Sequence, residues 1–592
     1  RRAPLVRPPA ALRQRHVLYR EEMFDGATAR GSDAERGVPN AQDTDFYEWR
    51  AQQMEFLGID TYSLDLLEFG ANQGWDSTPY GGNDWVYQSH KPQRWTSLLQ
   101  RLRDDYDFHV LPYYEYAGSK GANGLGFERR CATLGQRGLG PDGRDDYTHI
   151  SWSESANADL TDPDTFDDLG KMLDLTVLRE RNGLDFVGVW LRPRPSQHPI
   201  SFSDRCLGLF ATEANDGVAI TRGALQERGE LYDRYLDWWF ERRRQFLIAV
   251  RDFLRDGGIT DPTVLYTTDA TEGGVNYPSW TRRLVTDRPE LWPDEHPIAL
   301  SEAIASQRNF IAQTNPRLTW GDWEWEHAVP PADPQRYAAT PGVLLTHTFH
   351  HLFTVGDPDA LAAFTGPSGL AMIRHHNLNE DAFAFEGDKR VLGYLVADVE
   401  QAGPYGYLAE ARALAHGDQR FLGYLAANSY ARGFPAYARA FNRAFLALPA
   451  IASQRLPEAA DHAAVVVRRY DGGSHGIWYA VINTGLVDAD AVRITLPDAG
   501  PVTDLLSGAD LPRNGARIEL DCWPGQVHAL HLATDGHSRA IDIGYSGGSA
   551  AEILVAHQAG GEQVVREGAA VRFAGLSALA SHRFDFRPVL DD

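Results

Sequence analysis

From about residue 16 to residue 430, short runs of β-branched and aromatic residues alternate with longer amphipathic runs. This alternation is typical of a parallel sheet covered by helices, because each parallel strand needs a long crossover before the next one. Eight runs read as strands: His16–Met23, Ile59–Leu67, Phe108–Tyr114, Asp185–Leu191, Thr263–Thr268, Pro297–Ser301, Arg317–Trp320 and Gly342–Thr348. The pattern therefore predicts an α/β fold, a (β/α)₈ barrel of the TIM type.

Two helical patterns support this prediction. The apolar residues between Tyr232 and Leu254 recur at intervals of three, four and seven, which puts them on one face of a helix of roughly seven turns. A second helix is expected to begin within Thr161–Asp164, where a capping side chain, a proline and acidic residues coincide. The acids from Asp159 to Asp168 also admit a calcium site, but helix-start chemistry explains them more simply. We therefore expect no metal and no cofactor.

The character of the chain changes after residue 450. Four short alternating runs are separated by Gly, Asp, Asn and Pro, at Ala463–Arg469, Gly476–Asn483, Ala491–Leu496 and Val527–Leu532. Such runs are typical of an antiparallel β-sandwich. We expect a catalytic barrel at residues 1–450, a C-terminal β-sandwich at 451–535 and a further β-rich segment of structural role at 536–592.

One internal repeat falls between these parts. The tetrapeptide Leu-Gly-Tyr-Leu occurs at Leu392–Leu395 and again at Leu422–Leu425, with a helical stretch at Tyr407–His416 between the two copies. This order predicts one more strand–helix–strand unit, which closes the barrel or extends it.

The charge of the chain restricts its partners. It has 57 basic and 81 acidic residues, a formal net charge of −24, which argues against nucleic acid and anionic membranes because both carry the same sign. No stretch approaches the ~20 consecutive apolar residues of a membrane-spanning helix. A carbohydrate partner fits better, since sugar rings stack on aromatic side chains and the chain has 15 Trp and 24 Tyr. The oligomeric state stays open.

The first residues bear on location. The chain opens at Arg1 without an initiator Met or an apolar leader segment, so we expect that the true start has been removed. A secreted or periplasmic location is favoured over a cytoplasmic one.

The active site of a (β/α)₈ barrel forms at the carboxyl ends of its strands. Carboxylates follow several of the expected strands: Asp65, Glu68, Glu115, Asp269, Glu272, Glu302, Asp322 and Glu324. Glycoside hydrolysis needs one carboxylic acid to protonate the leaving oxygen and one carboxylate to act as nucleophile or base. Crowding also raises the pKa of one such group, which keeps it protonated near neutral pH. The pattern favours this chemistry, although any single acid also fits an ordinary polar loop.

Two carboxylates lead as catalytic candidates. Glu302 is the first large polar residue after the apolar run Ile298–Ser301, and Asp269 directly follows the apolar run Val264–Thr268. Each would therefore stand where a buried strand reaches the mouth of the barrel.

Asp322 and Glu324 are further catalytic candidates. They alternate with tryptophans that include Trp320 and Trp323. The segment predicts either a stacking platform for a sugar beside an acid or a strand edge with its tryptophans on the buried face.

Other residues near the strand ends are expected to contact the substrate: Tyr114, Glu115, Trp190, Arg192, Arg194, His347, His350 and Arg374. The pair Arg192 and Arg194 would bind a carboxylate or sulfate of an anionic sugar in a bidentate manner. Alternatively, the two arginines neutralise the acidic side chains of the protein that surround them. The histidines lack the His-Glu-x-x-His spacing of a zinc site, so they are expected to bond the substrate or to support the fold.

Four segments carry a family resemblance: Leu111–Tyr116, Asn157–Pro163, Trp190–Pro193 and Gly433–Pro435. With them, residues 15 to 535 resemble the barrel glycoside hydrolases, in particular a poorly characterised bacterial group with a C-terminal β-sandwich. The resemblance implies a glycosidase that degrades polysaccharides. Many retaining members carry their acid/base in an Asn-Glu dipeptide on the fourth strand, whereas Asn379-Glu380 comes late in this chain. The catalytic assignment therefore rests on position at the strand ends.

The sequence thus predicts a glycoside hydrolase that cleaves a poly- or oligosaccharide with two carboxylates. A polysaccharide lyase or metal-assisted hydrolase of an anionic glycan is one alternative, with Arg192, Arg194 and the histidines as working groups. A non-catalytic carbohydrate-binding protein is another. The fold alone does not decide among them, because this barrel supports many chemistries.

Overall fold

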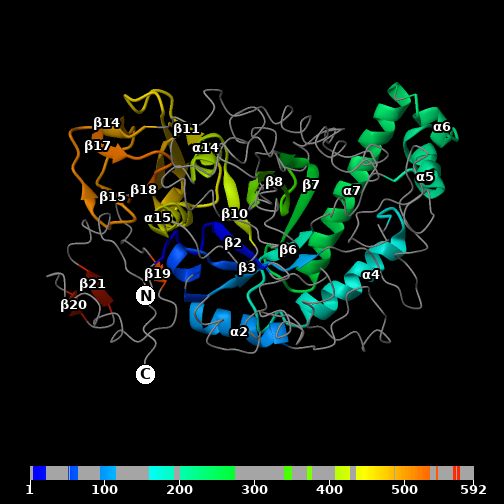
Figure 1. The fold of residues 1–592 in the computed structure, drawn as a ribbon, viewed down its shortest axis with the longest axis horizontal. Helices are drawn as coiled ribbons and strands as arrows, with labels where there is room; N and C mark the ends of the chain where they lie inside the picture. The colour runs from blue at the N-terminus through cyan, green and yellow to red at the C-terminus, as the bar shows by residue number, and fades with distance from the viewer. Residues whose placement is uncertain are drawn as a thin grey trace, which may run out of the picture.

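The computed structural model describes residues 5–21, 51–63, 94–114, 159–191, 201–273, 339–349, 370–375, 407–426, 435–533, 542–544, 564–567 and 570–573, apart from residues 53, 228 and 486. Its described part is a mixed α/β structure. Figure 1 shows antiparallel strands at one end of the molecule and the helices α5 (Asp204–Ala214) and α6 (Arg222–Leu225) at the other, with a parallel sheet between them.

The parallel sheet has nine strands in the order β4-β3-β2-β10-β9-β8-β7-β6-β5. Their bounds are β2 His16–Glu21, β3 Thr61–Ser63, β4 His109–Val110, β5 Tyr113–Tyr114, β6 Gly188–Leu191, β7 Thr263–Gly273, β8 Val343–Phe349, β9 Leu370–His375 and β10 Gln419–Ala426. Strands β3 and β6 are buried along their whole length, as expected when both faces of a parallel sheet are covered.

The two edge strands of this sheet are consecutive in the chain. Only Leu111 and Pro112 separate β4 from β5, and proline has no N–H with which to continue a strand. On one side, the Leu111 N–H donates to the carbonyl of Tyr62 in β3 at 3.0 Å; on the other, the Trp190 N–H of β6 donates to the carbonyl of Pro112 at 2.8 Å. One short segment therefore bonds to strands at both ends of the sheet order.

The helices beside this sheet follow the expected patterns. They are α2 (Arg94–Tyr106), α4 (Pro163–Leu173) with a π-helical continuation η3 (Asp174–Leu178), α5, α6 and α7 (Glu230–Asp256). Asp162 caps α4 by accepting from the Asp164 N–H at 3.0 Å, so the predicted helix start is confirmed. The helix α7 has 27 residues, and its predicted apolar face from Tyr232 to Leu254 is buried.

The strand predictions were partly wrong. Residues 297–301 and 317–320 lie outside the described residues, but β7 pairs directly with β8, so neither run separates those two strands in the sheet. Strand β9 was not expected. Strand β10 contains the second copy of the repeat, Leu422–Leu425, and pairs with β2 on one side and β9 on the other.

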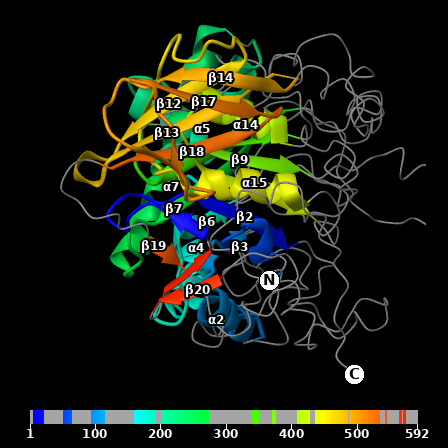
Figure 2. The same ribbon diagram turned by 90° about the vertical axis from the view of Figure 1, so that its left-hand side faces the viewer.

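The C-terminal strands are antiparallel, and the four runs predicted there are confirmed. Figure 2 looks onto them. Six form the order β11-β12-β13-β18-β15-β16, and two form the pair β14-β17. Their bounds are β11 Ser453–Arg455, β12 Val465–Asp471, β13 Ile477–Asn483, β14 Ala489–Thr495, β15 Val502–Asp504, β16 Asp510–Leu511, β17 Arg517–Cys522 and β18 Val527–Leu532, with a 3₁₀ turn η7 at Gly473–His475. Both sheets bury side chains in one shared apolar cluster.

Two helices join the antiparallel strands to the parallel sheet. They are α14 (Leu408–His416) and α15 (Pro435–Leu446), and each contacts strands of both parts. A single apolar cluster continues from the parallel sheet through α15 to the antiparallel strands.

The described tail also forms strands. Its β19 (Asp542–Gly544) pairs with β1 (Leu5–Arg7), and β20 (Val564–Glu567) pairs with β21 (Ala570–Phe573). Among the described helices, none has the length and apolar character required to cross a membrane.

Candidate functional site

The carboxyl end of β7 departs from regular pairing. Thr267 pairs with Thr346 of β8, and the next pair is Glu272 with Thr348. Four residues of β7, 268–271, therefore stand against the single residue His347. Such bulges occur often beside active sites, where they redirect a side chain or end the pairing. This irregular stretch contains Asp269, one of the two leading catalytic candidates.

Two predicted substrate contacts lie on the neighbouring strands. His347 of β8 pairs with Met372 of β9, and Phe349 pairs with Arg374 two positions further on. Because parallel strands present their carboxyl ends at one edge, Asp269, His347 and Arg374 belong to the same end of the sheet.

Below this end lies a layer of buried apolar side chains. It is formed by Leu18, Leu111, Trp190, Leu265, Leu344 and Phe421. Trp190 is fully buried in this layer, so its ring packs in the core of the sheet. The expectation that Trp190 contacts substrate is not supported by this position.

Tyr114, another predicted substrate contact, is also buried. Its side chain is fully buried, and its hydroxyl lies 2.7 Å from the hydroxyl of Thr176 in η3. Burial raises the pKa of Tyr114 well above its ordinary value. Tyr114 is the last residue of β5, but its buried side chain connects the sheet to the α4–η3 helix.

The remaining candidates lie outside the described residues. They are Glu115, Arg192, Arg194, Glu302, Trp320, Asp322, Trp323, Glu324 and His350. The chain order still limits where three of them attach: Glu302, Asp322 and Glu324 belong to the connection that leaves β7 at its carboxyl end and returns at β8.

A second polar cluster lies at the opposite, amino ends of the strands, and the sequence patterns did not reveal it. His16 is the first residue of β2, Asp60 directly precedes β3, and His109 is the first residue of β4. The rings of His16 and His109 are 4.9 Å apart. Three of the expected strands begin at or next to His16, Asp60 and His109. The recurrence of a polar residue at the start of neighbouring strands is the sequence signal from which the cluster could have been predicted.

Asp60 is the centre of this cluster. Its carboxylate accepts from the Val17 N–H at 2.6 Å and pairs with the Arg7 guanidinium at 2.6 Å, and His16 Nδ1 lies 3.3 Å away. Burial alone would raise the pKa of Asp60, but Arg7 and the two histidines hold it well below its ordinary value. Asp60 is therefore a buried carboxylate that stays charged because cations and donors surround it.

His16, Asp60 and His109 have the donor types of a metal site, with ligand atoms within 4.8 Å of one another. In this arrangement, however, both Asp60 oxygens already accept hydrogen bonds, and His109 Nδ1 lies 2.6 Å from Asp185 Oδ2. These contacts form a network of ion pairs around Asp60.

The acids proposed as an alternative calcium site have protein partners. Asp159 is buried and accepts from the Thr161 hydroxyl at 2.8 Å, the Ser201 hydroxyl at 2.9 Å and the Ser203 hydroxyl at 2.8 Å. Its neighbour Asp162 caps α4. The helix-start interpretation explains Asp162, whereas the Asp159 carboxylate is held by the hydroxyls of Thr161, Ser201 and Ser203.

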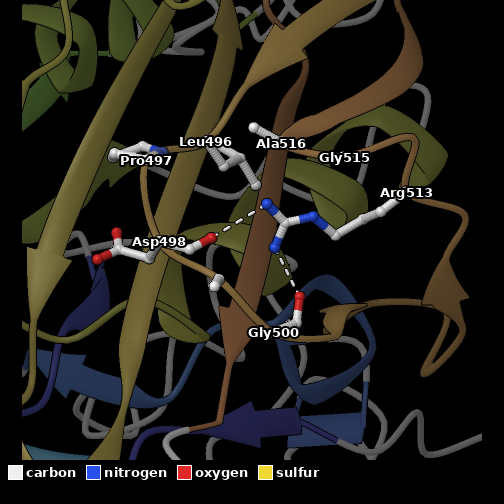
Figure 3. A pocket seen from close by; sticks show the side chains of 8 residues that line it. Leu496, Pro497, Asp498, Gly500, Arg513, Gly515 and Ala516 are labelled. Carbon is white, nitrogen blue, oxygen red and sulfur yellow. Dashed lines mark hydrogen bonds between the residues drawn. The ribbon is translucent and has the colours of Figure 1, made fainter.

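A hollow of about 390 Å³ opens among the antiparallel strands, between residues 496–500 and 513–516. Figure 3 shows Arg513 reaching across it, where the guanidinium donates to the main-chain carbonyls of Asp498 and Gly500. The Asp498 carboxylate turns instead to Arg469 Nε at 2.7 Å and to the Tyr479 hydroxyl. The hollow therefore lacks the pair of free carboxylates that glycoside hydrolysis requires.

Comparison with known proteins gives neither a matching family model nor a matching curated protein. Solved structures that match this chain include glycoside hydrolases. An α-amylase from Geobacillus thermoleovorans complexed with acarbose is 10% identical over 88% of this chain and 98% of its own, with a TM-score of 0.40. A GH30 endoxylanase from Clostridium papyrosolvens is 10% identical over 89% and 100%, with a TM-score of 0.37. A GH27 β-L-arabinopyranosidase from Geobacillus stearothermophilus, in complex with arabinose, is 11% identical over 88% and 97%, with a TM-score of 0.35.

Proposed function

We propose that the chain is a glycoside hydrolase whose parallel sheet closes into a (β/α)₈ barrel, followed by a C-terminal β-sandwich. Closure is supported by the segment Val110–Tyr113, which bonds to β3 on one side and to β6 on the other. Counting β4 and β5 as one interrupted strand gives the eight strands of such a barrel. The proposed domains are 1–450, 451–535 and 536–592.

The bulge at the carboxyl end of β7 is the observation that carries the proposed activity. It sets Asp269 against His347, at the edge where barrel enzymes assemble their active sites. The connection that follows begins at the same edge and carries Glu302, Asp322 and Glu324. Asp269 and Glu302 are our leading pair: one carboxylic acid protonates the leaving oxygen, and the other carboxylate acts as nucleophile or base.

The substrate is proposed to be a poly- or oligosaccharide. Glu115, Arg192 and Arg194 closely follow the carboxyl ends of β5 and β6, while His347 and Arg374 belong to the same ends of β8 and β9. Carboxylate, guanidinium and imidazole groups at one edge supply donors and acceptors for sugar hydroxyls, and the arginines would also bind an anionic sugar. His350 and the indoles of Trp320 and Trp323 are the other proposed contacts.

The test is a screen of the purified protein on neutral and anionic polysaccharides and aryl glycosides, with released reducing ends as the readout. We expect one substrate class to be cleaved, and Asp269→Asn or Glu302→Gln to lower kcat by ~10³ or more. The control is Asp256→Asn at the exposed end of α7. This substitution removes a carboxylate that is remote from the carboxyl ends of the strands, so the variant should keep full activity.

Three outcomes would redirect the assignment. Cleavage that survives both substitutions would move the catalytic roles to Asp322 and Glu324 or to other acids. An unsaturated product that absorbs in the ultraviolet would favour the lyase. Sugar binding without turnover would favour a carbohydrate-binding protein.

A further inference from the structure

The hydrogen bonds that close the parallel sheet form a short seam between residues 110–112 and residues 185–190. The Val110 N–H donates to the Asp185 carbonyl at 2.8 Å, the Val187 N–H to the Val110 carbonyl at 3.0 Å and the Trp190 N–H to the Pro112 carbonyl at 2.8 Å. Within the described residues, few main-chain bonds join the two sides, because β4 and β5 are two residues each. Side chains that bridge this seam therefore matter more than they would beside a long strand.

One ion pair bridges the seam at its amino end. His109 Nδ1, from β4, lies 2.6 Å from Asp185 Oδ2, from the segment that leads into β6. The Asp185 side chain is 56% exposed, and the His109 side chain is 25% exposed. The contact is a charged pair only while His109 carries a proton.

The surroundings of His109 decide where that proton resides. Burial by itself would lower the pKa of His109, but the close contact with Asp185 and the charges of Asp60 and Asp185 outweigh it and raise that pKa above its ordinary value. Arg7 opposes this rise weakly. For the adjacent His16, burial prevails over Asp60 and lowers the pKa to about 4, with His109 and Arg420 adding repulsion.

The lowered pKa of His16 and the raised pKa of His109 favour a proton on His109 over one on His16. With His16 neutral, the cations Arg7 and His109 balance the anions Asp60 and Asp185. The other charged group near Asp185 is Arg103, which lowers the pKa of Asp185 together with the two histidines. Two charged imidazoles in contact would repel, which is why a single proton is favoured.

We propose that the His109–Asp185 ion pair is a proton-dependent latch across the seam of the barrel. The latch is closed while His109 is protonated and opens when pH rises through the pKa of His109. Opening leaves the main-chain bonds of the seam without their bridge, so the amides of Val110 and Val187 exchange with solvent more often.

Hydrogen exchange of the intact protein between pH 6 and pH 9 tests this latch. After correction for the intrinsic pH dependence of exchange, the wild type should show a step to faster exchange in peptides that contain Val110 and Val187. Asp185→Asn should remove the step and leave these amides about two- to fivefold less protected at pH 6, the effect of losing a partly exposed ion pair. Asp105→Asn is the matched control, because Asp105 is 50% exposed and pairs with Arg101 of the same helix, α2, instead of with a residue of the seam.

Carbon-13 labelling of histidine gives an independent readout that does not depend on stability. We expect His109, assigned with His109→Gln, to remain protonated at pH 7 in the wild type and to titrate about 1 to 3 pH units lower in Asp185→Asn. A neutral His109 at pH 7 in the wild type would overturn the proposal. So would seam exchange that is the same in Asp185→Asn and Asp105→Asn.

Discussion

At the scale of single residues, the described structure separates two aspartates that look alike in sequence. Asp159 is 3% exposed and accepts hydrogen bonds from three hydroxyls and the Thr161 N–H. Asp162, in contrast, accepts one bond from the Asp164 N–H. Removing a buried acceptor leaves several donors without partners, whereas removing a cap exposes one N–H to water.

We therefore expect Asp159→Ala to lower the free energy of unfolding by about 3 kcal/mol or more. Asp162→Ala should lower it by about 1 kcal/mol. Urea denaturation at pH 7 measures both. Equal losses would contradict this assignment, and stabilisation of the wild type but not of Asp159→Ala by millimolar calcium would restore the calcium interpretation.

At the scale of elements, close approach between β6 and β7 depends on one glycine. Gly188, with φ of +143°, begins β6, and a Cβ there would lie 1.8 Å from the carbonyl oxygen of Thr263. Gly188→Ala should lower the free energy of unfolding by about 3 kcal/mol, because main chain must move to admit the methyl group.

The control is Gly208→Ala on α5, where the added methyl group meets nothing within 4 Å. This substitution should raise the free energy of unfolding by about 0.5 to 1 kcal/mol by restricting the unfolded chain. Thermal denaturation of the two variants decides, and a stable Gly188→Ala would contradict the strand pairing.

The sequence predicted elements best where the pattern was long. The apolar face of α7 repeats over many turns. The C-terminal runs alternate apolar and polar residues and are bounded by residues such as Gly and Asp. Both patterns were therefore recognised. Pattern alone did not reveal β9, because Leu370–His375 has one β-branched residue and no regular alternation. A short apolar run also does not indicate which strands it pairs with, so only the sheet register shows that β7 pairs with β8.

The candidate site could likewise be predicted only in part. Asp269 and His347 could be placed because strand ends are visible in sequence, whereas Arg374 lies on β9, a strand that the pattern did not predict. The structure puts all three on strands of one sheet. The sequence did not show that Tyr114 and Trp190 are buried, because the face on which a strand residue lies depends on packing. The His16–Asp60–His109 cluster was missed because three distant segments meet only through the register of β2, β3 and β4.

At the scale of the whole molecule, Arg15 ties the parallel sheet to the antiparallel strands. It is fully buried; its Nε donates to the Pro449 carbonyl at 3.2 Å and its Nη1 to the Gln419 carbonyl at 2.5 Å. Its guanidinium also lies over the rings of Phe445 in α15 and Tyr470 in β12, at 4.9 and 5.4 Å. Together with the apolar cluster that continues across residue 450, these contacts predict that the two parts unfold together.

Scanning calorimetry should therefore show one cooperative transition for the wild type, in spite of the domain boundary that we propose near residue 450. Arg15→Met keeps the apolar stem but leaves two buried carbonyls without their donor, so we expect a loss of about 2 to 4 kcal/mol and separation of the trace into two transitions. Arg13→Met removes a partly exposed pair with Asp261 and should cost less than about 1 kcal/mol with a single transition retained. Two transitions already in the wild type would mean that the shared cluster does not couple the parts; a single transition in Arg15→Met would mean that the apolar contacts couple them without Arg15.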